Sequence, residues 1–101
     1  MPKFIYLYTG GTPPVDAESG RKVMQAWMAY MAGLGDYAVA DGGGPLGARQ
    51  SIGDGPASRT VGYSTVEADD LTEAVALTDG HPHLGMGGAI EVIEVLPIPA
   101  G

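Results

Sequence analysis

The chain has 101 residues, 45% of them hydrophobic, and its twelve acidic and five basic residues give a net charge of −7. This length fits a single domain over residues 1–101, and the hydrophobic share is that of a folded chain rather than a disordered one. The acidic balance argues against nucleic acid and anionic membrane surfaces as partners, because both carry negative charge.

The sequence contains no cysteine, which excludes disulfides, thiolate nucleophiles and cysteine-bound metals. The strand-like opening is too short for the core of a signal peptide. No apolar run approaches the roughly 18 residues that a membrane-spanning helix needs. We therefore expect a cytoplasmic protein without membrane association.

The first predicted strand, over residues 3–8, is apolar on both faces. Alternation places Phe4, Tyr6 and Tyr8 on one face and Ile5 with Leu7 on the other. A face exposed to water would be polar at every second position, so both faces should be covered. In a chain this short, helices cover one face and a second copy of the chain can cover the other.

A helix is predicted next, capped by Asp16 or Ser19, running to about Leu34 and ending at a glycine C-cap in residues 33–35. Its apolar residues form one stripe at helical spacing: Val23, Met24, Trp27, Met28, Tyr30, Met31 and Leu34. We interpret this stripe first as core packing. The alternative is a pocket wall formed by Trp27 or a methionine, since methionine clusters can line adaptable pockets.

A short second strand is predicted over residues 36–40, followed by a loop. Residues 42–58 contain six glycines and two prolines, which favours irregular structure. This segment is either a mobile linker or a functional loop. It lacks the motifs that bind phosphate groups. Arg49 and Arg59 within and beside it could hold an anionic ligand or offset nearby surface acids.

The last third begins with a predicted strand over residues 60–66. A helix follows, with Asp70 as N-cap and Glu73 three residues later as its capping partner. Leu71, Ala74 and Val75 are expected to form its buried stripe, with Leu77 beside them. Gly80 and Pro82 should end the helix, and a glycine-rich turn should then lead into a final strand over residues 89–96.

The order strand, helix, strand, strand, helix, strand predicts a ferredoxin-like α+β fold. In this fold a four-stranded antiparallel sheet carries two helices on one face. The helical crossovers further suggest that the strands they connect lie as parallel neighbours in the interior of the sheet. The other face of the sheet would remain open in a single chain.

Seven short motifs follow one another along the chain: residues 4–8, Trp27, Asp41-Gly-Gly-Gly-Pro45, Gly62-Tyr63, residues 67–71, Pro82-His83 and residues 88–95. In their order and spacing they resemble the YCII-related family, which includes the DGPF-type domains. The resemblance covers most of the chain apart from about residues 46–60. It implies a dimeric α+β barrel, in which two four-stranded sheets pack face to face.

The resemblance also implies enzymatic activity around a histidine and aspartate pair. In some members of the family that histidine lies in the first helix, whereas this helix contains no histidine and Trp27 falls at the corresponding place. Asp41, Pro45 and His83 are the positions that carry over.

His83 is the leading candidate for acid-base chemistry, because the usual pKa of histidine suits proton transfer near neutral pH. Asp41 is the predicted carboxylate that orients it. The alternatives are that His83 bonds the backbone and fixes the turn, or that it forms a metal site with His81. A third ligand for such a site, Asp79 or Glu91, is weakly supported, and we predict no metal and no cofactor.

The ligand contacts are predicted at Tyr6, Trp27, Pro45 and Arg49. Together these features suggest a homodimer that binds a small organic molecule and performs cofactor-free lyase or isomerase chemistry. Two alternatives remain: a non-catalytic ligand-sensing or interaction module, and a cofactor-free oxygenase on the same barrel. The sequence leaves open whether the protein is an enzyme.

Overall fold

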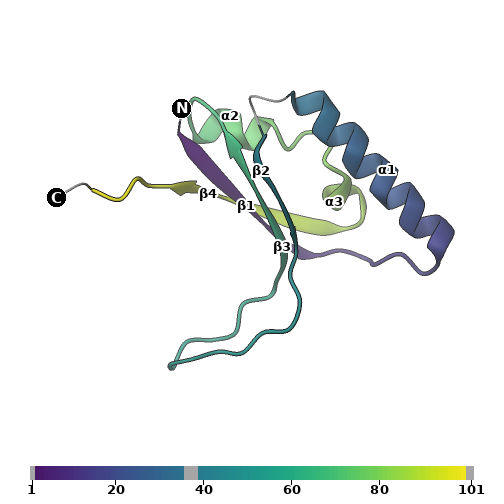
Figure 1. Cartoon of the computed structure of the whole chain (residues 1–101), viewed down its shortest axis with the longest axis horizontal. Helices are drawn as coiled ribbons and strands as arrows, with labels where there is room; N and C mark the ends of the chain where they lie inside the picture. Colours follow the sequence, from purple (N-terminus) through teal and green to yellow (C-terminus); the bar gives the residue numbers. More distant parts are fainter. Residues whose placement is uncertain (1, 36–38, 100–101) are drawn as a thin grey trace.

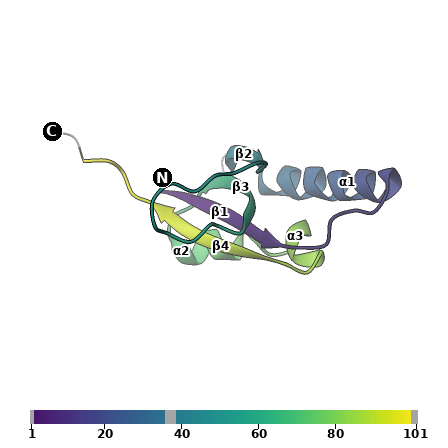
Figure 2. The same cartoon turned by 90° about the horizontal axis from the view of Figure 1, so that it is seen from below.

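The computed structural model describes residues 2–35 and 39–99. The chain folds into a four-stranded antiparallel sheet with helices against one face, as Figures 1 and 2 show. The elements in chain order are β1 (Lys3–Gly10), α1 (Ala17–Leu34), β2 (Val39–Pro45), β3 (Thr60–Glu67), α2 (Leu71–Ala76), α3 (Pro82–Gly85) and β4 (Gly88–Val95). The predicted α+β ferredoxin-like fold is confirmed, with α3 as an additional short helix.

The strands lie in the order β2-β3-β1-β4, and every neighbouring pair is antiparallel. The expectation of parallel neighbours was therefore wrong. Each helical crossover passes over a whole strand position, so β3 lies between β1 and β2, and β1 lies between β3 and β4. Strands joined by a helix are separated by one strand that runs the other way.

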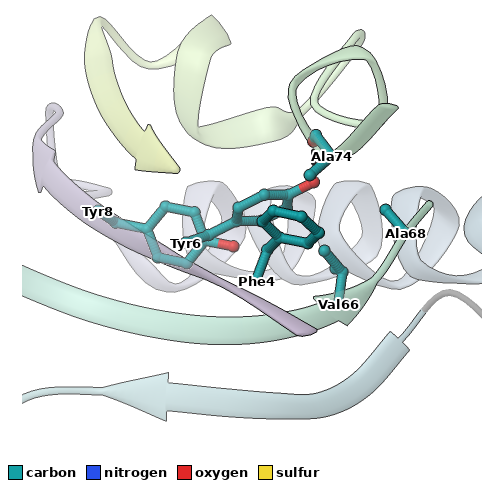
Figure 3. Packing of buried hydrophobic residues seen from close by; sticks show 6 residues of the cluster. All are labelled: Phe4, Tyr6, Tyr8, Val66, Ala68 and Ala74. Carbon is teal, nitrogen blue, oxygen red and sulfur yellow. Dashed lines mark hydrogen bonds between the residues drawn. The ribbon is translucent and has the colours of Figure 1, made fainter. Parts of the chain in front are cut away.

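The core lies between the helices and the β1–β3 pair (Figure 3). It consists of Phe4, Tyr6, Tyr8, Val66, Ala68 and Ala74, all at most 4% exposed. The Tyr6 hydroxyl, deep in this layer, donates to the Ala74 carbonyl and so ties β1 to α2. Burial raises the pKa of Tyr6 and keeps its hydroxyl protonated.

The opposite face of the sheet carries apolar side chains beside Lys3 and Glu91. Ile5 pairs with Ile93, and Lys3 pairs with Val95 across the β1–β4 ladder. Ile93 and Val95 are 40% and 42% exposed, while Ile5 and Leu7 are half-buried. The molecule measures 51 × 38 × 18 Å, and Figure 2 shows the four strands stacked along the thin direction. Within the part of the chain that the structure describes, no element covers this face.

Helix α1 begins where Asp16 accepts a hydrogen bond from the Ser19 backbone N–H at 2.7 Å, which confirms Asp16 as one of the two predicted caps. It ends before Gly35, whose φ of 78° ends the helical conformation. The interpretation of its stripe as core packing holds for Trp27, which is partly buried and packs against the core, but not for Met24 and Met28, which are 62% and 66% exposed. The apolar side of α1 faces a cavity instead.

Strand β2 spans Val39–Pro45, later than the predicted residues 36–40, of which 36–38 lie outside the described part of the chain. The glycines expected to start the loop thus belong to the strand. Gly43 adopts a φ of 66°, and a Cβ there would lie 1.8 Å from the Tyr63 carbonyl oxygen. Only glycine permits β2 to approach β3 at this irregularity.

Residues 46–59, which we call the arm, connect β2 to β3 and project away from the body of the domain (Figure 1). Every residue of the arm is exposed. At its base the Arg49 guanidinium donates to the Ser58 and Thr60 carbonyls at 2.6 and 2.7 Å. These bonds hold the two limbs of the arm together.

Helix α2 is capped as predicted. The Glu73 N–H donates to Asp70 Oδ1 at 2.8 Å, and Glu73 Oε1 accepts from the Asp69 N–H at 3.1 Å. The predicted buried stripe was largely wrong, because Ala74 is buried whereas Leu71 and Val75 are 50% and 49% exposed. The helix ends at Ala76, four residues before Gly80, which is too short for a full buried stripe.

The segment predicted as a turn contains α3, which begins at Pro82 with His81 as its N-cap. The final strand is one residue earlier than predicted, Gly88–Val95. None of the helices in the described part of the chain is long and apolar enough to span a membrane.

Candidate functional site

A cavity of about 720 Å³ lies between α1 and the sheet. Its helix wall is apolar, and its sheet wall includes Gly42, Gly44 and Gly62, which have no side chains to fill the space. The residues that line it are Tyr8, Pro14, Gly20, Val23, Met24, Trp27, Met28, Met31, Gly42, Gly44, Pro45, Val61, Gly62, Tyr63 and His83. Its volume is in the range of small-molecule sites, about 300–1,000 Å³.

His83 is the polar side chain at the α3 end of this cavity. It is 5% exposed, and its Nε2 lies 2.8 Å from the Thr9 carbonyl oxygen. A carbonyl only accepts hydrogen bonds, so Nε2 carries the proton. In the neutral imidazole Nδ1 then has a free lone pair. Among the described residues no hydrogen bond reaches Nδ1, which makes it available as a proton acceptor.

Two glycines make room for the His83 ring. A Cβ on Gly88 would lie 2.2 Å from Nε2, and one on Gly11 would lie 3.0 Å from Cε1. On its third side the ring packs against Tyr8, with ring centroids 5.3 Å apart. The glycine-rich ends of β1 and β4 therefore form a slot that fixes the orientation of the imidazole.

His81 holds the backbone of His83 in place. It is 2% exposed, and its Nδ1 accepts the backbone N–H of His83 at 3.1 Å. Its Nε2 must then carry the proton and donate to the Tyr8 hydroxyl, 3.1 Å away, and that hydroxyl is in turn hydrogen-bonded to Ser64 Oγ. Burial, with a smaller contribution from the charge of His83, lowers the pKa of His81 to about 4, so it is neutral at pH 7.

Aromatic rings enclose His81. The Trp27 ring meets it edge-on at 4.6 Å between centroids, and the Tyr30 ring lies 4.3 Å away. The Tyr30 hydroxyl donates to the Leu77 carbonyl at 2.7 Å, and burial raises the pKa of Tyr30 to about 12. This cluster connects α1 to α3, and Trp27 in it contacts His81 and also lines the cavity.

Some of the residues predicted for the site line the cavity, and the others lie outside it. His83, Trp27 and Pro45 all line the cavity. Tyr6 lies in the core below it, bonded to Ala74. Asp41 is exposed on β2, and its Oδ1 accepts the Gly43 N–H at 2.9 Å. The Nε2 of His83 is held by the Thr9 carbonyl rather than by this carboxylate.

Arg49, the remaining predicted ligand contact, lies on the arm beside a smaller hollow of about 310 Å³ that it lines with Ser58 and its neighbours. Both of its recorded hydrogen bonds go to arm and β3 carbonyls. It is therefore part of the arm and not of the large cavity.

Thr9 was not predicted as part of the site, and His81 was considered only as a metal ligand together with His83. Tyr8 was placed on one face of its strand but was not among the predicted ligand contacts. The signal for Tyr8 was present, because alternation places it on the helix side of its strand. His81 and Thr9 gave no such signal, since their roles depend on contacts with residues more than 70 positions away. Within the described residues no group of three histidine and carboxylate side chains could hold a metal ion.

The fold and the cavity together define an α+β domain of the ferredoxin-like type with a ligand-sized, mainly apolar site ending at a histidine. The chain belongs to the YCII-related family, whose domain matches residues 4–99.

Among solved structures, the chain resembles 5-chloro-2-hydroxyhydroquinone dehydrochlorinase from Burkholderia phenoliruptrix, determined in complex with 2,5-dihydroxybenzoquinone. The identity is 22%, the TM-score is 0.53, and the match covers 91% of this chain and 90% of that one. At this identity the likeness extends to the fold. No curated protein sequence matches the chain at a significant level.

Proposed function

We propose that the cavity binds a small organic molecule and that His83 exchanges a proton with it, without a cofactor. The observation that carries this proposal is the state of the His83 ring. Its Nε2–H is anchored on the Thr9 carbonyl, its Nδ1 has no hydrogen-bond partner among the described residues, and the side chain lines an apolar cavity. A positioned base of this kind is what general acid-base catalysis requires.

In the proposed step, Nδ1 takes a proton from an acidic C–H or O–H bond of the ligand, and the electron pair of that bond stays on the ligand. The resulting imidazolium is stabilised by the Thr9 carbonyl, whose oxygen carries partial negative charge. Returning the proton to a different atom gives an isomerisation. In an elimination the electron pair of the broken C–H bond forms a double bond, the leaving group departs with the electrons of its own bond, and the imidazolium returns the proton to it. Neither outcome needs an oxidant or a metal.

The structural neighbour supports this class of chemistry by analogy, because it is a dehydrochlorinase and was solved with a six-membered ring compound bound. In the proposal, Trp27 and Pro45 shape the cavity that holds the ring. Tyr6 and Asp41 act at a distance, through the β1–α2 contact and the irregular turn of β2. Arg49 braces the arm.

The test uses 2-tetralone, an enolisable ring compound of suitable size, in deuterated buffer. The wild-type protein should accelerate exchange of its acidic C–H hydrogens, followed by NMR, beyond the rate given by an equal concentration of free imidazole. His83→Gln should reduce the enzymatic rate about 100-fold, because glutamine cannot accept the proton. Circular dichroism checks that the variant is folded. Equal rates for the two proteins would contradict the role of His83.

The same assay separates two orienting groups for His83. If the Thr9 carbonyl orients the ring, Asp41→Asn should lower the exchange rate much less than His83→Gln does. If Asp41→Asn lowers the exchange rate as much as His83→Gln does, the result supports the prediction that the Asp41 carboxylate orients His83. Either result assigns the orienting group.

A non-catalytic binding module is the second candidate, favoured by the mainly apolar lining of the cavity. It predicts that 2-tetralone shifts the indole N–H signal of Trp27, the sole tryptophan, without any exchange above the imidazole rate. Binding without exchange would therefore select this reading over the enzyme.

We further propose that the protein is a homodimer, with the open sheet face as its interface. Ile5, Leu7, Ile93 and Val95 lie on this face without a covering layer in the described residues. A second copy of the same face would bury them, and two-fold symmetric pairing of one patch with itself is the commonest mode of assembly.

A further inference from the structure

The charge of the cavity wall restricts the ligand further. Among the described residues that line the cavity there is no Asp, Glu, Lys or Arg. Trp27 and the thioethers of Met24, Met28 and Met31 dominate its helix side. Thioethers make favourable contacts with aromatic rings, so this wall suits a flat ring.

An anionic ligand would meet two costs in this site. Its charge would lose part of its hydration at the cavity wall and would find no cation there, and an unpaired charge that is taken out of water is unfavourable. The protein's net charge of −7 would add repulsion at longer range. A neutral ring meets neither cost.

The hydrogen-bonding groups at the His83 end of the cavity restrict the ligand as well. The Tyr8 hydroxyl is already engaged with His81 and Ser64, whereas Nδ1 of His83 is an acceptor without a recorded partner among the described residues. The ligand atom that faces Nδ1 must therefore carry a hydrogen that it can donate, from an O–H group or an acidic C–H group.

We propose that the cavity selects an uncharged aromatic ring with a hydroxyl group, a phenol, whose O–H donates to Nδ1 of His83. This inference rests on the proposed function, because it names the ligand class of the same site. It excludes carboxylated and phosphorylated rings.

Three probes of nearly equal size test this selection by calorimetric titration at pH 7.5. They are p-cresol, which is neutral with a donor; 4-methylanisole, which is neutral without one; and p-toluate, which is an anion. We expect p-cresol to bind roughly fivefold more tightly than 4-methylanisole, the value of one hydrogen bond. We expect p-toluate to bind at least about tenfold more weakly than p-cresol.

A gain-of-function variant tests the charge argument without disturbing the core. Met28 is 66% exposed on the cavity wall, so Met28→Lys should fold and supply the missing cation. It should raise the affinity for p-toluate about tenfold relative to p-cresol. Gln25→Lys is the matched control, because it adds the same charge at an exposed position of α1 that does not line the cavity. That control should leave the ratio unchanged.

The outcomes separate this inference from the proposed function. If none of the three probes binds, the small-molecule site itself is contradicted. If p-toluate binds as tightly as p-cresol, or if Gln25→Lys changes the ratio as much as Met28→Lys, the site stands and its selection for a neutral ligand is overturned. If p-cresol and 4-methylanisole bind equally, the hydrogen bond to His83 is overturned.

Discussion

Gly88 controls the position of the His83 imidazole. Because a Cβ at this position would lie 2.2 Å from Nε2, Gly88→Ala must displace the ring from the Thr9 carbonyl. We expect a loss of about 2 kcal/mol in the free energy of unfolding, typical of overpacking, together with loss of proton exchange on 2-tetralone. Urea unfolding and the NMR exchange assay measure the two effects.

Gly85→Ala is the matched control for this substitution, since a Cβ at Gly85 meets no atom within 4 Å. It should change stability by less than about 0.5 kcal/mol, as surface substitutions usually do. Wild-type activity in Gly88→Ala would mean that the ring does not depend on its slot.

His81 makes the fold sensitive to mild acid. Its pKa is about 4 in the folded protein, below the ordinary value of 6.5, so the unfolded chain binds a proton first as the pH falls. Neutral His81 makes its full contribution to the free energy of unfolding above about pH 6.5. This contribution is lost as the pH falls from 6.5 to about 4. The loss should approach about 1.4 kcal/mol per pH unit in this window.

Urea unfolding at pH 7 and pH 5 measures this loss, and His81→Asn provides the reference because it does not titrate. The wild-type protein should lose more stability over this interval than the variant. Parallel pH profiles for the two proteins would show that His81 is not held neutral by the fold.

For single residues, the sequence predicts which side chains belong to the site better than it predicts their hydrogen-bond partners. His83 was predicted from its chemistry and lies at the cavity, but its Nε2 bonds a backbone carbonyl, and every residue carries one. No pattern in the sequence distinguishes the Thr9 carbonyl from the rest. Asp41 was the natural expectation because carboxylates commonly orient histidines, whereas here it bonds its own strand at Gly43.

Helix α1 illustrates the same limit for whole elements. The cap at Asp16 and the apolar stripe predicted its bounds closely. The stripe did not reveal how far the helix stands from the sheet. That distance depends on the strands opposite, where Gly42, Gly44 and Gly62 leave space that larger side chains would fill. Periodicity therefore identified an apolar face but not whether protein or a ligand covers it.

The arm can be removed with little effect on the fold. All of residues 46–59 are exposed, so no buried apolar area is lost if residues 48–57 are replaced by a two-residue Asn-Gly turn. The shorter connection also lowers the entropy of loop closure slightly. We expect the free energy of unfolding to change by less than about 1 kcal/mol.

Urea unfolding measures the stability of the shortened variant, and titration with p-cresol measures whether its cavity still binds the ligand. A variant with the same ten positions changed to a glycine-serine sequence of equal length separates the effect of length from that of sequence. A loss of more than about 2 kcal/mol in the shortened variant would show that the arm stabilises the domain through contacts absent from a single chain.

For the whole molecule, the order of elements was sufficient to predict the fold class, because two helical crossovers and one hairpin leave few arrangements. The same reasoning failed on which strands are neighbours, since it placed helix-linked strands side by side, whereas one strand separates each such pair. The doubly apolar first strand was the more informative feature. Its second face, with Ile5 and Leu7, is on the side of the sheet that no described element covers.

This open face leads to a prediction about assembly. If two copies pair through it, the wild-type protein should sediment at twice the 10.3 kDa chain mass. Ile93→Lys should give a folded monomer, because Ile93 is 40% exposed in the single chain and its replacement would bury a charge only in the dimer. Thr72→Lys, at an exposed position of α2 on the helix side of the sheet, is the matched control and should remain dimeric.

Salt provides an independent check on the same interface. Each chain carries a net charge of −7, so the two copies repel one another at low ionic strength. An apolar interface does not weaken when salt screens charges, whereas the repulsion does. Raising the salt concentration from 20 to 300 mM, roughly a fourfold reduction in screening length, should therefore tighten the wild-type dimer in sedimentation equilibrium. Dissociation by salt would point instead to ion pairs as the source of affinity, and a wild-type monomer at every salt concentration would rule out the dimer.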